Sequence, residues 1–171
     1  MVELKGDCEN CAALCCVALA FDKGDMFGFD KAAGQACPEL QPDFRCGIHG
    51  RLPEAGFAGC VQYDCLGAGQ RVVQQVFAGQ NWRNTPALLA PMLQAFAQMR
   101  QVHELLLLLQ TAGGLPLSEP QKQELARLKA GLQPDTGWTS QTLRLFERSG
   151  LAGEVQQFLR ELKDVAIKMK P

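Results

Sequence analysis

Eight cysteines lie close together near the start of this 171-residue chain. All of them fall between Cys8 and Cys65, and the 106 residues that follow Cys65 contain none. Thiols gathered in this way form disulfides in an oxidising compartment or bind metal ions in a reducing one. Either arrangement stabilises a segment that is too small to rely on an apolar core alone. The cysteines are Cys8, Cys11, Cys15, Cys16, Cys37, Cys46, Cys60 and Cys65.

The first residues favour metal binding over disulfides. Glu3, Asp7 and Glu9 precede the only early apolar run, whereas a secretory leader begins with basic residues. The uncharged run 84–99 is shorter than the ~20 residues of a membrane-spanning helix. We therefore expect a cytoplasmic protein without a membrane segment, whose cysteines stay reduced and bind metal.

The charge distribution argues against nucleic acid as a partner. The chain has 17 Lys and Arg against 18 Asp and Glu, a net charge of −1. Within residues 1–65, ten acidic side chains face five basic ones. Nucleic acids and anionic membranes attract basic surfaces. We expect neither of these partners, but a metal ion and, as a further candidate, a protein.

The chain divides into two parts with different patterns. Residues 1–66 contain closely spaced Gly and Pro, which predict loops. From residue 67 onward, apolar residues recur every three or four positions, which predicts helices. We expect a mainly α fold, in which a loop-rich cysteine-based metal lobe (1–66) packs on a bundle of four or five helices (67–171). No polar linker separates the two parts, so they should form one compact unit.

Local signals set the limits of the expected helices. Thr85 is a candidate N-cap, and Pro91 should kink or restart the helix that follows. A capping box at 118–121 opens another helix, and Thr139 or Ser140 caps the next. The final helix carries an apolar stripe that reaches Met169. The expected ranges are about 69–77, 86–112, 119–131, 140–146 and 151–169.

The spacing of the first cysteines is typical of metal ligands. Cys8 and Cys11 form a CxxC pair, which lets two thiolates reach one ion around a tight turn. If residues 7–21 are helical, Cys11 and Cys15 lie within about 60° of Cys8 on one face. Cys16 would then point to a second metal, a cluster edge or the core. The adjacent cysteines predict either two sites or one multinuclear site.

The remaining candidate ligands come from distant segments. Cys46-x-x-His49 also has ligand spacing, so His49 is a ninth donor. Eight thiolates divide into two four-cysteine sites, whereas nine donors allow other divisions. Zinc takes four N or S ligands and a [4Fe–4S] cluster takes four cysteines, so the spacing leaves both cofactors open. In the alternative interpretation, Cys16 and Cys65 are buried apolar residues.

Two further residue patterns have simpler explanations. A thioredoxin-like role for Cys8-x-x-Cys11 needs a preceding strand, for which seven residues leave no room. His103 lies on the apolar face of the long expected helix, so we interpret it as a hydrogen-bonded core residue and not as a ligand.

The order of these motifs resembles that of a known family. Cys8-x-x-Cys11-x-x-x-Cys15-Cys16, Cys37-Pro38-x-Leu40, Asp43-Phe44-Arg45-Cys46-x-Ile48-His49 and Cys60 are similar to the zinc- or iron-chelating CxxCxxCC family of bacterial proteins. The stretch from Gly59 to Gln70 also resembles a Cys-rich module at the start of some bacterial pentapeptide-repeat proteins. The resemblance implies metal chelation by the first seven cysteines. A longer segment before Cys60 departs from the family pattern and makes Cys65 a substitute ligand.

The sequence lacks the motifs of common enzyme classes. It contains no Gly-x-Ser-x-Gly elbow, no His-Glu-x-x-His and no P-loop. We therefore expect a metal-binding protein that holds zinc or an iron–sulfur cluster, with a helical part that supports the site or binds a partner. The alternative is an iron-dependent redox enzyme that uses the same cysteines.

Overall fold

The fold is mainly α, as the sequence predicts. The computed structural model describes residues 3–167, and within them β structure is limited to three isolated bridges. The helices are α1 (Leu14–Ala18), α2 (Ala58–Gln62), α3 (Ala68–Arg71), α4 (Leu89–Ala112), α5 (Glu119–Leu132), α6 (Ser140–Phe146), α7 (Leu151–Glu161) and α8 (Lys163–Ile167), with tighter or wider turns η1 (Cys8–Asn10), η2 (His49–Arg51), η3 (Val72–Val76) and η4 (Pro86–Leu88).

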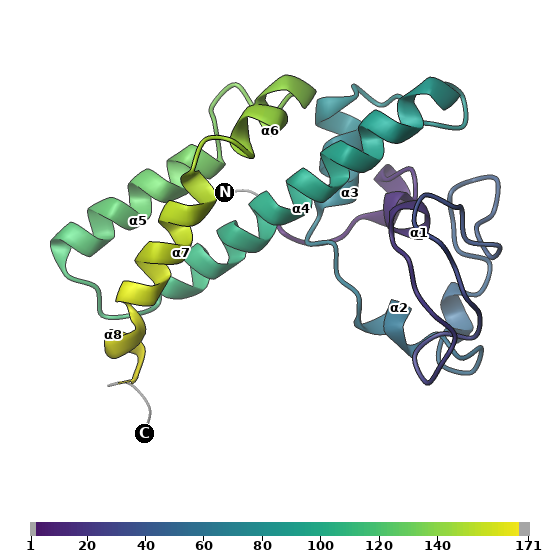
Figure 1. The fold of residues 1–171 in the computed structure, drawn as a ribbon, viewed down its shortest axis with the longest axis horizontal. Helices are drawn as coiled ribbons and strands as arrows, with labels where there is room; N and C mark the ends of the chain where they lie inside the picture. Colours follow the sequence, from purple (N-terminus) through teal and green to yellow (C-terminus); the bar gives the residue numbers. More distant parts are fainter. Residues whose placement is uncertain (1–2, 168–171) are drawn as a thin grey trace.

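Helix α4 is the element on which both parts of the chain are built. Its 24 residues extend over about 36 Å at 1.5 Å per residue. Figure 1 shows the loops of residues 3–66, here called the cysteine lobe, at one end of α4, and α5, α7 and α8 at the other. Met92, Phe96 and Leu106 are buried along its length. Because α1, α3, α5, α6 and α7 all contact α4, this helix fixes their relative positions.

Pro91 restarts the long helix and does not kink it. Pro86 begins the turn η4, and α4 starts only at Leu89. Pro91 therefore lies in the first turn of α4, where a helix leaves its backbone N–H groups without internal partners and a proline removes nothing. Thr85 is the N-cap residue, as expected, and Pro86 follows it at the first position of η4, although the Thr85 side chain makes no capping hydrogen bond.

The other expected helix starts are confirmed by their hydrogen bonds. The Ser118 backbone N–H donates to Gln121 Oε1 at 2.9 Å, as in a capping box. Thr139 Oγ1 accepts from the Thr142 N–H at 3.1 Å and caps α6. The expected inward position of Met169 lies outside the described residues.

The cysteine lobe has a small aromatic core of its own. Phe21 and Phe27 stack with ring centroids 4.3 Å apart, and Phe29 meets the edge of Phe57 at 4.9 Å. The Phe27 ring also lies directly on the backbone of Gly59, where a side chain would overlap it. This lobe contains little regular secondary structure. Packing between aromatic rings therefore stabilises its loops in place of the backbone hydrogen bonds of a sheet.

The main core continues from the helices into the cysteine lobe. Leu14 is fully buried, and both Ala12 and Leu14 belong to the same apolar cluster as α4. The Trp82 indole N–H donates to the Ala12 carbonyl at 2.8 Å, across 70 positions of sequence. The segment that carries Cys11, Cys15 and Cys16 is therefore anchored to the helical part.

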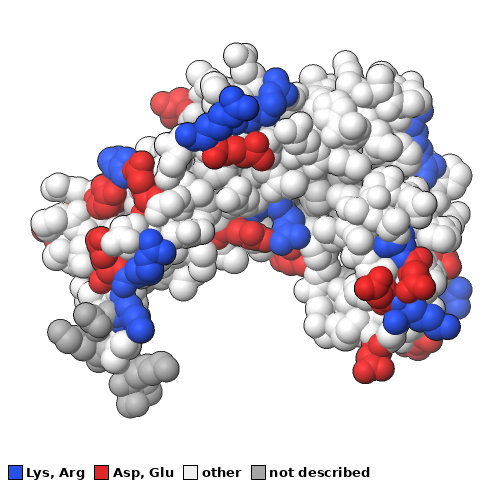
Figure 2. Space-filling model, in the orientation of Figure 1, with Lys and Arg blue, Asp and Glu red and all other residues white. Residues whose placement is uncertain are grey.

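Charges of both signs are interspersed on the surface. Figure 2 shows acidic and basic side chains mixed over α5 and α7, and again at the tip of the cysteine lobe. The visible face carries no large patch of one sign. Among residues 3–167, no helix combines the length and apolar character needed to cross a bilayer.

Candidate metal centre

The segment with the first cysteines is divided into short elements. Cys8 lies in η1, where the Asp7 carboxylate accepts the Glu9 backbone N–H at 3.1 Å. Ala13 then adopts a left-handed backbone, with φ of 51°, before α1 begins at Leu14. A continuous helix over residues 7–21 is therefore wrong, and helical angles cannot place Cys8, Cys11 and Cys15 on one face.

Cys15 and Cys16 are adjacent on α1, and the proximity of their thiols affects the pKa of both. Cys16 raises the pKa of Cys15. Cys15 in turn lowers the pKa of Cys16, and the Lys31 ammonium acts in the same direction. Hydrogen bonds and cations stabilise a thiolate, which is the form that binds metal.

Four cysteines open tight turns. In each turn, the cysteine carbonyl accepts the backbone N–H of the residue three positions later. Such turns fold the chain back immediately after each cysteine. The turns begin at Cys8 (3.4 Å), Cys37 (3.0 Å), Cys46 (3.2 Å) and Cys65 (2.9 Å).

Burial raises the pKa of Cys37, of Cys46 and of Cys11, the last to about 11. Nearby backbone N–H groups lower the pKa of these thiols against the effect of burial, because they favour the charged thiolate. These groups belong to Glu39 for Cys37, to Ile48 for Cys46, and to Leu14 and Ala13 for Cys11.

Lys31 is a buried cation at the centre of the cysteine lobe. Its residue is only 5% exposed, and its ammonium donates to three carbonyls: Val17 at 3.2 Å, Ala32 at 3.2 Å and Gln35 at 2.9 Å. None of the ion pairs among the described residues includes Lys31. Burial lowers the pKa of Lys31, while the thiols of Cys37, Cys16 and Cys15 favour its charged form. A buried charge requires compensating partners. The three carbonyls and the Phe21 ring, whose centroid lies 5.5 Å from the Lys31 Nζ, act as such partners.

The first cysteines are held against α3. The side-chain amide of Gln70 accepts from the Asp7 N–H at 3.2 Å and donates to the Lys5 carbonyl at 2.7 Å. Cys11 Sγ lies so close to Gly69 that a Cβ there would be 2.5 Å from the sulfur. Cys65 ends the loop before α3, and its sulfur lies 3.7 Å from the Cβ position of Gly6.

Cys37 and Cys46 lie on two loops that hydrogen-bond to each other. The Gly47 N–H donates to the Glu39 carbonyl at 2.8 Å, while the Cys37 N–H donates to the Cys16 carbonyl at 3.0 Å. Cys60 lies in α2, beside the Gly59 that supports Phe27. Burial raises the pKa of Cys60, and Cys16, Cys37 and Cys46 add to the effect.

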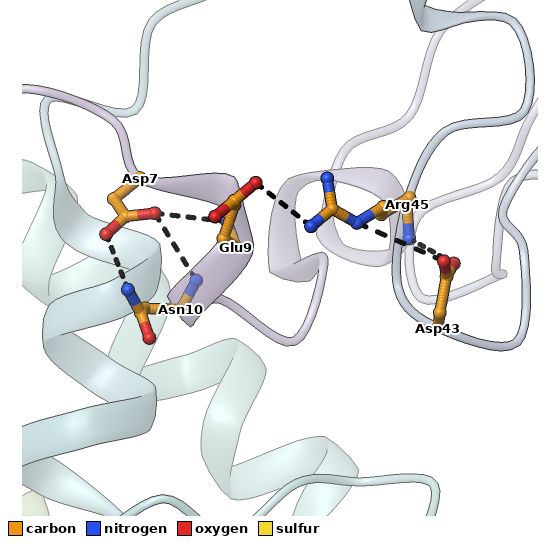
Figure 3. A network of polar contacts seen from close by, with 5 residues as sticks. All are labelled: Asp7, Glu9, Asn10, Asp43 and Arg45. Atoms are coloured by element: carbon orange, nitrogen blue, oxygen red, sulfur yellow. Dashed lines mark hydrogen bonds and ion pairs between the residues drawn. The ribbon is translucent and has the colours of Figure 1, made fainter.

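A charged contact joins two of these segments. Arg45 donates to the Glu9 carboxylate at 3.0 Å, and Figure 3 shows the two side chains extended toward each other. Glu9 follows Cys8, and Arg45 precedes Cys46. Both side chains are exposed, so the pair orients the two segments more than it stabilises them.

The two histidines have different surroundings. His49 is exposed, and none of the side-chain hydrogen bonds described here involves its ring. His103 is 2% exposed, and its Nδ1 donates to the Leu66 carbonyl at 2.6 Å, which confirms the expected core histidine. Burial lowers the pKa of His103.

The donor set consists of eight free thiols gathered in one lobe. Cys8 and Cys60 are exposed and the other six are partly buried. Within residues 3–167, no three Cys, His, Asp or Glu side chains stand in an arrangement that would hold a metal ion. Thiolate sulfur is a ligand type that zinc and iron–sulfur clusters take, so the donor type suits these cofactors although the arrangement of the described side chains does not.

Sequence reasoning missed Lys31, Gly69 and Gln70. Lys31 lies among acidic residues between Cys16 and Cys37, which is a weak signal for a buried cation. Gly69 was expected only as part of a helix start, and its contact with Cys11 depends on the fold. Gln70 carries no sequence signal for its contacts near residues 5–7.

The chain resembles one uncharacterized bacterial protein. Over 163 residues, 95% of the chain, it is 36% identical to the uncharacterized protein YybG of Bacillus subtilis (strain 168). The match covers 58% of that relative, so the chain spans little more than half of its length. No protein-family model matches the chain, and no solved structure matches it.

Proposed function

We propose that this chain is a cytoplasmic metal-binding protein that holds zinc or an iron–sulfur cluster through its cysteine lobe. The observation that carries this proposal is the presence of eight free thiols in one small lobe. The same lobe buries the Lys31 ammonium, which takes part in none of the ion pairs among the described residues. A metal ion bound by thiolates is an anionic group, and zinc with four thiolates has a net charge of about −2. It would supply the negative charge that buried Lys31 needs.

The construction of the lobe supports the same proposal. It has loops and a small aromatic core in place of long helices, so it needs an internal cross-link. Structural zinc contributes roughly 10–16 kcal/mol of apparent binding free energy in small peptides.

Metal analysis of the protein tests the proposal. The chain is purified anaerobically without added metal, and zinc and iron are measured per chain together with the visible spectrum. We expect at least one stoichiometric metal. Zinc leaves the protein colourless, whereas an iron–sulfur cluster makes it brown. A metal-free protein whose eight thiols all react freely under reducing conditions contradicts the proposal.

The redox alternative makes a different prediction. A catalytic iron site keeps an open coordination position, and so would use fewer than four cysteines per metal. Iron together with a cluster ligated by three cysteines would favour the enzyme over the structural or binding role.

A further inference from the structure

We propose that the cavity beside His103 binds a small carboxylic acid that carries a hydrogen-bond donor on its α-carbon, as amino acids and α-hydroxy acids do. The cavity has a volume of about 290 Å³ and lies between α3 with η3, the middle of α4, and the segment 132–138. None of its lining residues is a cysteine. The inference therefore goes beyond the proposed metal-binding function and does not depend on it.

His103 brings an unused hydrogen-bond acceptor to this cavity. Its Nδ1–H donates to the Leu66 carbonyl, so the neutral ring has a free lone pair on Nε2. Among the described side-chain atoms without a hydrogen-bond partner, only Arg83 Nε and Gln98 Nε2 are sealed from solvent. His103 Nε2 has no partner among these residues either, so it reaches open space, and the cavity is the space that this side chain lines. A buried acceptor of this kind requires a donor.

Arg71 brings a positive charge to the same cavity. It is the last residue of α3, and its guanidinium contacts Gln75 Oε1 at 3.4 Å, which is a long hydrogen bond. None of the ion pairs among residues 3–167 includes Arg71. A guanidinium binds a carboxylate through two parallel N–H groups. Arg71 also lowers the pKa of His103, which keeps the imidazole neutral and able to accept.

Apolar side chains and one glycine shape the rest of the cavity. Leu106, Leu132 and Trp138 line it and would cover an apolar side chain of the ligand. The Trp138 indole N–H donates to the Leu132 carbonyl at 3.3 Å, which fixes the ring. Gly137 has a φ of 73°, and a Cβ there would lie 2.2 Å from Gln75 Nε2. The Gln75 amide therefore packs directly on this loop and closes the cavity between η3 and the loop.

The lining groups together select the ligand chemistry. Arg71 binds the carboxylate, and His103 Nε2 accepts from the ammonium or hydroxyl group on the neighbouring carbon. A simple carboxylate would leave this acceptor unpaired, which costs binding free energy. Asp135 also lines the cavity, and its negative charge favours an ammonium over a hydroxyl group.

Three ligands with one carbon skeleton test these roles on the unmodified full chain. L-Leucine and 2-hydroxy-4-methylpentanoate carry the donor, whereas 4-methylpentanoate lacks it. Calorimetric titration at neutral pH should show binding of a donor-carrying ligand at least about tenfold tighter than that of 4-methylpentanoate. Tighter binding of leucine identifies an amino acid as the ligand, and tighter binding of the hydroxy compound identifies a hydroxy acid. Equal affinity for all three, or no binding of any, would overturn the proposal.

Nitrogen NMR of the same samples shows where the ligand binds. The ¹⁵N resonance of His103 Nε2 should shift when this atom accepts a hydrogen bond, whereas the ring nitrogens of exposed His49 should not respond. This measurement needs no variant, so it remains decisive if a substitution in the cavity prevents folding. Binding without a shift at His103 would place the ligand elsewhere and overturn the proposal.

Two variants separate the charged groups. Arg71→Met should lower the affinity for the tighter ligand at least about tenfold, whereas Arg148→Met, which removes an exposed arginine outside the cavity, should leave it unchanged. Asp135→Asn should weaken leucine more than the hydroxy compound. Equal affinity of the two arginine variants would overturn the proposal. Metal content is measured in the same samples, so failure of this proposal is distinguishable from failure of the proposed metal-binding function.

Discussion

The guanidinium of Arg45 binds the carboxylate of Glu9 at 3.0 Å, across 36 positions of sequence. Each residue adjoins a cysteine, since Glu9 follows Cys8 and Arg45 precedes Cys46. The contact therefore joins turn η1 to the loop before η2 at the protein surface.

Removal of this ion pair should have a small effect. Because both side chains are exposed, Glu9→Ala or Arg45→Ala should lower the free energy of unfolding by less than about 1 kcal/mol. Chemical denaturation of both single variants and the double variant gives the coupling energy, which should shrink as salt is raised. Loss of metal from either variant would show that the pair has a larger role than its exposure indicates.

Removal of the Lys31 ammonium should have a large effect. Lys31→Met leaves three carbonyls without their donor and the thiolates without their cation, so we expect a loss of about 2–4 kcal/mol in unfolding free energy. We also expect faster metal release to a chelator. Lys23→Met is the matched control, since Lys23 is exposed, and it should change neither measurement. Equal metal release rates in both variants would contradict the role of Lys31.

Two helical glycines should respond in opposite ways to alanine. Gly69→Ala forces Cys11 Sγ away from α3 and should lower stability by about 1–3 kcal/mol, together with metal retention. A Cβ at Gly153 in α7 meets nothing within 4 Å, so Gly153→Ala should raise stability by about 0.5–1 kcal/mol. Thermal unfolding and metal content of the two variants check both expectations. A Gly69→Ala variant with full metal content would indicate that Cys11 is not part of the metal site.

His103 should make stability depend on pH. Burial holds its pKa below the ordinary value of 6.5, so the folded protein binds fewer protons than the unfolded chain. Its contribution is present above pH 6.5 and is lost as the pH falls through the lowered pKa. His103→Asn, which can still donate to Leu66, should flatten the pH dependence of the melting temperature. An unchanged pH dependence in His103→Asn would contradict this role of the buried imidazole.

The helices could be predicted because their signals are local. α5 spans Glu119–Leu132, close to the expected 119–131, since the capping box and apolar spacing lie within the helix itself. His103 could be placed in the core because it shares a helix face with Phe96 and Leu106. The restart at Leu89 was anticipated from Pro91 for the same local reason.

The arrangement of the cysteine lobe could not be predicted in this way. Ala13 adopts a left-handed backbone that alanine rarely takes, so no turn signal interrupts the helical pattern there. Gln70 binds the Lys5 carbonyl from 65 positions away, and Lys31 is buried by loops that have no period. The spacing of the cysteines could therefore identify candidate metal ligands, but it could not predict which residues lie next to each thiol.

The indole bond from Trp82 to Ala12 has a consequence for the newly made chain. All eight thiols leave the ribosome before α4, against which their segment packs, has been synthesised. At about 5–20 residues per second, the stretch between Cys65 and the end of α4 takes roughly 2–10 s to translate. During that interval the sulfurs are open to oxidants and to competing ions. If the lobe binds metal as proposed, the speed of translation past this helix, as well as the supply of metal, sets how many chains mature correctly.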